Sequence, residues 1–273
     1  MIRLIFAAFA CLANPGFANM ASSPASGPDV TRMAGSDVVA LGEVHDNPGH
    51  HQSQASIVAA MQPPALVFEM LSADQAARIT DANRLDESAL KAAFDWDHAG
   101  WPDFAYYYPI IAAAPEAKIY GAGLARGEAR QAMTSGITGY FGADAPRFGL
   151  DQPLNETEQT DREAFQHAAH CDALPAAMLP VMVELQRLRD AMLARAVLRA
   201  LTETGGPVVV ITGNGHARKD WGLPVYLERA HPGLDIFALG QSEEGQISGG
   251  FDAVMDFPAI KRPDPCLAFE KQD

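Results

Sequence analysis

Two histidines end the same short pattern, Gly-x-x-His, at the close of two apolar runs. The first run spans 38–45 and ends at His45, and the second spans 208–216 and ends at His216. Buried parallel strands read as continuous apolar runs, and ligands of open α/β sheets bind beyond the carboxyl ends of such strands. We therefore expect both imidazoles at one edge of a sheet.

Two carboxylates accompany these histidines. Glu43 lies within the first motif, and Glu69 ends a third apolar run over 66–68. Titratable groups that converge in a cleft mark functional sites, so we interpret Glu43, His45, Glu69 and His216 as one polar cluster. The alternative for each residue alone is a hydrogen-bonded loop side chain.

Two kinds of chemistry suit this cluster. His45, Glu69 and His216 are candidate ligands of a divalent metal ion, with an open position for water. Without a metal, Glu43 would orient His45 as the general base of a hydrolase. The chain has no H-E-x-x-H, G-x-S-x-G, P-loop or G-x-G-x-x-G motif, so the corresponding zinc, serine and nucleotide chemistries have no support.

A helix is predicted directly after the first motif, over 49–61. Asn47 is its expected N-cap and Pro48 its first residue, which places His50 and His51 in the first turn. The positive end of a helix dipole disfavours protonation of an imidazole, and the neutral form is the one that ligates metals. Both histidines are therefore candidate ligands.

The second motif is rich in glycine. Residues 213–215 let the backbone approach a ligand closely and expose N–H groups to an anion, and Arg218 and Lys219 follow. The loop would suit a ligand that carries carboxylates. The alternative is an ordinary turn between a strand and a helix.

Further apolar strands are expected at 118–124, 234–239 and 251–257. Their alternation with helices predicts an α/β fold, with a mostly parallel sheet flanked by helices and right-handed crossovers. Two segments with helical spacing, about 72–114 and 156–204, do not follow this alternation of strands and helices. They predict a smaller inserted helical subdomain.

Two features within these segments carry further expectations. Methionines and leucines recur at helical spacing over 178–192 and predict a helix core, because methionine fills irregular gaps. The aromatic-rich segment 96–109 contains Trp101 and three tyrosines. It either packs between two lobes or lines a flat hydrophobic ligand.

The composition bounds the class of protein. A chain of 273 residues with 48% hydrophobic content can bury one large core, and we expect a single domain over 37–273. The formal charge of −14 makes nucleic acid an unsuitable partner, because phosphate neutralisation requires clustered basic residues.

The N-terminus predicts export. Residues 1–18 resemble a signal peptide, 19–36 form a lead-in rich in small residues, and attachment to a membrane is expected only if Cys11 is lipidated. Cys171 and Cys266 remain after cleavage. In an oxidising compartment such a pair predicts a disulfide.

Five groups of residues resemble the ChaN family of haem-binding uptake proteins, in order between about 38 and 239. The paired Gly-x-x-His is shared with the broader Tiki-like superfamily, which includes metal-dependent proteases and erythromycin-esterase-like hydrolases. The matching groups are 42–51, 68–70, 100–102 with 107–109, 186–192 and 212–216.

The resemblance implies a periplasmic α/β protein with a smaller helical bundle that takes part in haem and iron uptake. It implies a homodimer that holds haem between its subunits and exchanges it with uptake machinery, and a phenolate ligand helped by histidine. Tyr107 occupies the Tyr-x-Pro position and is the first choice, before Tyr106 and Tyr108. The other expected haem-binding residues are His50, His51, Trp101 and Arg218. A hydrolase remains the alternative.

Overall fold

A computed structural model describes residues 30–264 and 266–267 of the chain. The predicted signal peptide, Cys11 and residues 19–29 of the expected lead-in lie outside the described residues. Residues of the lead-in that are described include a short helix, α1 (Val30–Ala34), which precedes the first strand.

Six parallel strands form one sheet in the order β3-β2-β4-β1-β5-β6. Every strand occurs where an apolar run predicts one, and the α/β fold is confirmed. The two central strands, β1 and β4, are buried along their whole length and consist mainly of apolar residues, many of them β-branched. The strands are β1 (Val38–Glu43), β2 (Ala65–Phe68), β3 (Lys118–Gly121), β4 (Val208–Gly213), β5 (Ile236–Glu243) and β6 (Ala253–Phe257).

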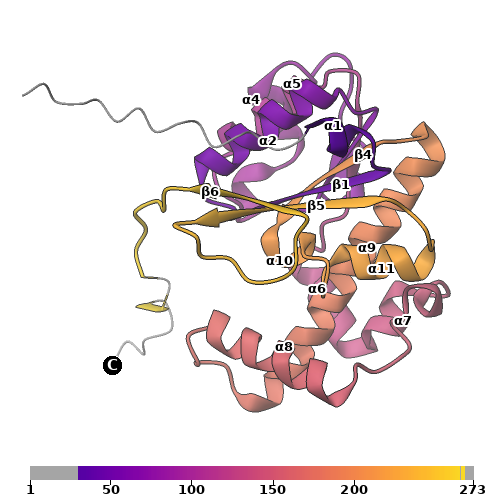
Figure 1. The fold of residues 1–273 in the computed structure, drawn as a ribbon, viewed down its shortest axis with the longest axis vertical. Coiled ribbons are helices and arrows are strands. Elements are labelled where there is room, and N and C mark those ends of the chain that lie inside the picture. The colour runs from indigo at the N-terminus through magenta and orange to yellow at the C-terminus, as the bar shows by residue number, and fades with distance from the viewer. Residues whose placement is uncertain (1–29, 265, 268–273) are drawn as a thin grey trace, which may run out of the picture.

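Helices cover both faces of the sheet (Figure 1). Alternate side chains of β1 point to opposite faces, with Val39 in the core beneath one layer and Val38 in the core beneath the other. The first layer contains α2 (Pro48–Met61), α3 (Ala73–Ala76), α4 (Glu87–Ala93) and α5 (Phe104–Ala113), and the second contains α6 (Arg126–Ser135), α7 (Ile137–Phe141), α9 (Leu179–Thr204), α10 (Asn214–Ala217) and α11 (Leu223–Ala230). Helix α8 (Glu156–Ala169) lies farther from the sheet and packs on α9.

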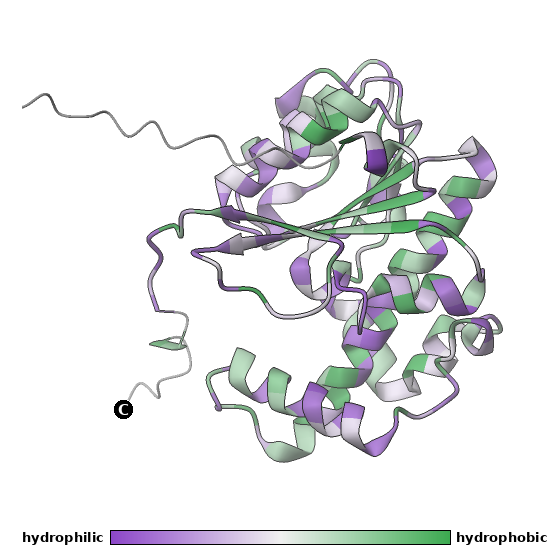
Figure 2. Cartoon of the chain, viewed as in Figure 1, coloured by the Kyte–Doolittle hydropathy of each residue, from purple (hydrophilic) through white to green (hydrophobic). Residues whose placement is uncertain are grey.

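The two helical segments of the sequence belong to different layers. Buried residues of 72–114 share a core with α2, whereas those of α9 pack on the other face of the sheet. The two segments thus lie on opposite faces of the sheet, because each face of a parallel sheet needs its own apolar cover. In Figure 2 the strands are the most continuously hydrophobic part of the chain, and the helices are hydrophobic on one side.

The long helix α9 carries the predicted methionine stripe. Leu185 and Leu188 are buried in the core, and Met182 and Met192 pack against it while partly exposed. Met178 precedes the helix in a short turn, Ala176–Met178. In the described part of the chain, no helix combines the length and apolar character needed to cross a membrane.

Local capping sets the start of α2. The Asn47 side chain accepts a hydrogen bond from the Gly49 amide at 2.9 Å, and Pro48 is the first helical residue, as expected. His50 and His51 therefore lie in the first turn of α2, and both side chains are buried.

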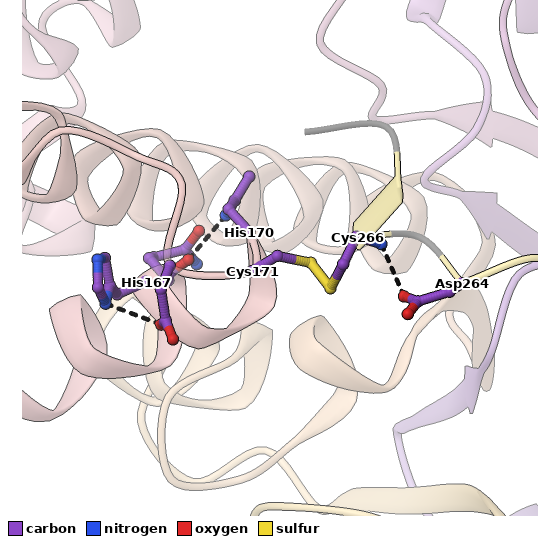
Figure 3. Close-up of a disulfide and its surroundings, with 7 residues drawn as sticks. His167, His170, Cys171, Asp264 and Cys266 are labelled. Atoms are coloured by element: carbon purple, nitrogen blue, oxygen red, sulfur yellow. Dashed lines mark hydrogen bonds and ion pairs between the residues drawn. A yellow bond between two sulfur atoms is a disulfide. The ribbon is translucent and has the colours of Figure 1, made fainter. Parts of the chain in front are cut away.

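A disulfide joins Cys171, which follows α8, to Cys266 in the C-terminal segment (Figure 3). The two Cα atoms are 5.4 Å apart. The pairing expected from the two cysteines is therefore present in the structure, and it ties the segment after β6 to the helical layer.

Candidate functional site

The two Gly-x-x-His motifs meet because their strands are neighbours. Glu43 of β1 pairs with Gly213 of β4, so the motifs are offset by one residue along the sheet. β2 lies on the other side of β4, and Glu69 follows it directly. The expected cluster of Glu43, His45, Glu69 and His216 therefore forms at one edge of the sheet.

The first glycine of each motif makes room for a residue of the other motif. A Cβ atom on Gly213 would lie 2.9 Å from His45 Nε2, and one on Gly42 would lie 2.4 Å from Asn214 Oδ1. Both distances are too short for a real side chain. The loops interlock, which gives a steric reason for glycine at the first position of both motifs.

Glu69 is the centre of the cluster. Its Oε2 accepts hydrogen bonds from Thr212 Oγ1 at 2.6 Å and from the Gly213 amide at 2.8 Å. Its Oε1 lies 3.5 Å from His216 Nε2 and 4.0 Å from His45 Nε2. Burial alone would raise the pKa of this carboxyl, but the two imidazoles and the two donors outweigh it and lower the pKa to about 2.

His45 is paired with a carboxylate of its own strand. Its Nδ1 donates to Glu43 Oε1 at 2.7 Å, and its side chain is 32% exposed. Burial opposes a charge on this ring, but the hydrogen bond to Glu43 and the charge of Glu69 raise the pKa of His45 to about 9.

His216 is paired with a carboxylate from a distant element. Its Nδ1 donates to Asp190 Oδ1 on α9 at 2.7 Å, and its side chain is 10% exposed. Burial opposes its charge, but Glu69 and Asp190 together raise the pKa of His216 above its usual value. Each histidine thus has Nδ1 on a carboxylate and Nε2 turned toward Glu69.

This arrangement contains the three predicted metal ligands, His45, Glu69 and His216. Carboxylate partners at Nδ1 are the usual outer contacts of metal-binding histidines. Nevertheless, no group of three or more His, Cys, Asp or Glu side chains among the described residues is arranged to hold a metal ion. The divalent metal therefore stays a prediction.

Tyr107 is not exposed in this chain. The residue is 1% exposed, and its hydroxyl donates to Glu43 Oε1 at 3.0 Å. Burial and the charge of Glu43 raise the pKa of the phenol above its usual value. The phenolate needed for haem ligation is thus disfavoured in this conformation. Tyr106 and Tyr108, on the same helix, are partly exposed.

The structure does not present His50 and His51 to solvent either, contrary to their expected role as ligands. Nδ1 of His50 accepts from the Val44 amide at 2.9 Å and its Nε2 donates to the Ser242 carbonyl at 3.3 Å. His51 Nε2 donates to the His45 carbonyl at 2.8 Å. Burial lowers the pKa of His50, so the expected neutral imidazole is found, but it holds the loop of His45 in place.

Trp101 and Arg218 lie in different surroundings. Trp101 is partly exposed, stands 4.9 Å from the His45 ring, and lines a cleft of about 1660 Å³ together with His45 and His216. Arg218 is buried, pairs with Asp220 and stacks on Trp221 at 3.9 Å. Because its guanidinium is already satisfied, Arg218 is a poor candidate for binding a ligand carboxylate.

Three contributors to the site were missed from the sequence: Asp190, Thr212, and Tyr107 in its role as a donor to Glu43. The available signal for Asp190 was the segment 186–192, which resembled the ChaN family but had no assigned role. Its carboxylate reaches His216 only because α9 packs beside α10.

Comparison with known proteins is consistent with this geometry. The sequence model of the family described as "Haem-binding uptake, Tiki superfamily, ChaN" matches residues 30–227. A solved structure of ChaN of Campylobacter jejuni, described as showing cofacial haem binding, is 21% identical with a TM-score of 0.66, covering 82% of this chain and 89% of that one. This similarity indicates a shared fold.

A second solved structure, the type III effector HopBA1, is 14% identical over 85% of this chain and 92% of that one, with a TM-score of only 0.43. No curated protein matches the chain.

Proposed function

The chain belongs to the ChaN family of haem-binding uptake proteins of the Tiki superfamily, and from this premise we propose that it binds haem and takes part in haem and iron uptake. The observation that carries the proposal is the family match itself. It extends over residues 30–227 and includes both Gly-x-x-His motifs, Glu69 and Asp190.

The cleft beside His45 is the best candidate for the haem site. Its volume of about 1660 Å³ exceeds the roughly 300–1,000 Å³ of typical small-molecule pockets. Trp101 and Met192 supply apolar surface in its wall. Bound haem would supply ferric iron that accepts an imidazole or phenolate ligand. His45, a third exposed, is more accessible than the buried Tyr107, but its ring must lose a proton, which its pKa of about 9 disfavours, before Nε2 can bind iron.

Location and assembly belong to the same proposal. We propose export to the periplasm, a homodimer that holds haem between its subunits, and transfer of haem to uptake machinery. The signal-like residues 1–18 and a disulfide, which persists mainly in oxidising compartments, support export. Membrane attachment enters the proposal only through lipidation of Cys11.

Titration of the mature protein with ferric haem tests the proposal. We expect saturable binding, and a change in the haem spectrum when His45 is replaced in His45→Gln. His231, which is exposed and lies outside the cleft, provides the matched control, and His231→Gln should leave the spectrum unchanged. If the wild-type protein binds no haem, the proposal is wrong.

Tyr107→Phe tests the phenolate prediction separately, because it removes only the oxygen and keeps the ring packing. A sharply changed haem spectrum with nearly unchanged thermal stability would support Tyr107 as ligand. An unchanged spectrum would exclude it and leave Tyr106 and Tyr108 as the tyrosines to replace.

A hydrolase is the second candidate function, and one specific observation favours it. His45 and His216 each give Nδ1 to a carboxylate and turn Nε2 toward Glu69. Such a pair suits either a divalent metal site or a general base, with Glu43 orienting His45.

Metal analysis and ester or peptide hydrolysis by the purified protein would test this candidate. We expect His45→Ala and His216→Ala each to lower metal affinity or turnover. The loss in the double variant should be smaller than the sum of the losses in the two single variants. Additive losses would show that the two histidines serve separate places, and no bound metal with no turnover would exclude the hydrolase.

A further inference from the structure

We infer that the cleft contains a carboxylate subsite, in which the guanidinium groups of Arg126 and Arg189 bind the acidic groups of the ligand. The inference deepens the proposed function and rests on it. If the ligand is haem, the groups bound there are its propionates.

The cleft is positively charged although the chain is acidic. Seven of the chain's 20 Lys and Arg residues line it, against five of the 34 Asp and Glu residues. A net charge of −14 repels an anionic ligand at long range. A locally cationic cleft offsets this repulsion at one place on the protein.

Most arginines of α9 have partners, but Arg189 does not. Arg187 bonds the carbonyls of Gly149 and Gln152 and pairs with Glu184, and Arg199 pairs with Glu203. Arg189 has no hydrogen bond or ion pair to any side chain or carbonyl of the described residues. It is partly exposed in the cleft, near enough to His216 for its charge to oppose protonation of that ring.

Gln186 lies one helical turn before Arg189 and lines the same cleft. Its amide oxygen is buried and has no hydrogen-bond partner in the described structure. A buried polar atom without a partner costs free energy. The wall beside Arg189 therefore has an unused acceptor, which can take a hydrogen bond from a donor group of a ligand but not from an ionised carboxylate.

Arg126 approaches the cleft from another element. It is the first residue of α6, where the helix dipole disfavours a cation. Its Nη2 would lie 3.4 Å from a Cβ atom on Gly100, so the guanidinium reaches the loop that carries Trp101. No described residue forms an ion pair or hydrogen bond with this guanidinium. A bound carboxylate would supply the missing negative charge.

Arginine suits this role because its planar group offers paired donors that match a carboxylate. The sequence placed carboxylate binding at Arg218, but Asp220 already occupies that side chain. Among the described residues, the arginines of this cleft without a partner are 126 and 189, and they line it together with Trp101, His45 and His216.

A comparison of ferric haem with its dimethyl ester, in which both propionates are methylated, tests the subsite. We expect the wild-type protein to bind haem at least roughly tenfold more tightly than the ester. The double variant Arg126→Gln, Arg189→Gln should bind both ligands with the affinity of the ester. Lys261→Gln removes one charge from an exposed position outside the cleft and should keep the wild-type difference.

Iron-free protoporphyrin, which has the same carboxylates, should show the same dependence on the two arginines. Equal affinity of the wild-type protein for haem and ester, or a difference retained by the double variant, would overturn the subsite while haem binding stands. Failure of the wild-type protein to bind haem at all would overturn both the subsite and the proposed function. Circular dichroism of each variant would verify that it is folded.

Discussion

The two Gly-x-x-His loops have the same pattern but different surroundings. His45 lies in an irregular loop after β1, is 32% exposed, and pairs with a carboxylate two residues away. His216 lies in the one-turn helix α10, is 10% exposed, and pairs with Asp190 from α9. One histidine is oriented locally, and the other is fixed by tertiary packing.

The difference extends to what supports each loop. Arg262, in the C-terminal segment, pairs with Asp46 and Glu243, and the Asn47 side chain donates to Glu243 at 2.7 Å. This segment lies beyond the 30–227 region that matches the family. The loop of His45 thus depends on a feature outside the family match, whereas the loop of His216 depends on α9.

The largest effect is expected from removing the disulfide, which anchors the C-terminal segment that carries Arg262. Replacing both cysteines by serine removes a cross-link between residues 95 positions apart, and should lower the free energy of unfolding by about 3 kcal/mol. Urea unfolding measures this loss. Hydrogen exchange should increase in residues 44–47 and not in 214–217. Two reactive thiols per chain in denatured, unreduced protein would contradict the disulfide.

The second prediction breaks the interlock between the loops. Gly213→Ala should lower the free energy of unfolding by about 2 kcal/mol, because its Cβ would lie 2.9 Å from His45 Nε2. Gly215→Ala is the matched control, since no atom lies within 4 Å of a Cβ there. Thermal unfolding of both variants compares them, and equal losses would show that the close approach is unimportant.

The third prediction concerns how the free energy of unfolding depends on pH through His45, the more exposed of the two histidines. The pKa of His45 is about 9 in the folded chain and 6.5 without its surroundings. Its contribution to stability is therefore complete below pH 6.5 and is lost as pH rises through 9. We expect a loss of about 1–2 kcal/mol, less than the whole shift implies because solvent screens a partly exposed ring.

Urea unfolding at pH 6 and pH 9 measures this slope. His45→Gln should flatten it, while His231→Gln, at an exposed histidine, should not. A slope unchanged in His45→Gln would mean that His45 is not charged in the folded protein.

The smallest effect is expected from the contact of the tail with the first loop. Arg262→Gln removes the pairs with Asp46 and Glu243, and should cost less than about 1 kcal/mol because these groups are partly solvated. The adjacent Lys261→Gln is the control. If haem binds through His45, only Arg262→Gln should alter its affinity, and identical affinities would show that the tail does not influence the site.

Much of the fold could be predicted because local patterns encode it. The strand positions, the capped start of α2 and the shared edge of His45, Glu69 and His216 follow from apolar runs and from the geometry of parallel sheets. The surroundings that could not be predicted are those of side chains that packing buries. Tyr107, His50 and Arg218 have suitable chemistry, but each is engaged by a partner that packing brings to it.

The sequence by itself determined which residues lie at the carboxyl edge of the sheet, because strand ends and helix caps are set by neighbouring residues. Only the tertiary structure decided their partners. Asp190 and His216 are 26 positions apart, and Glu69 and Gly213 are 144 apart, so their contacts depend on how α9 and the strands pack. Arg187 and Arg199 each have a glutamate three or four residues away on the same helix, whereas Arg126 and Arg189 have none, but only the tertiary structure decided that these two unpaired arginines line the cleft.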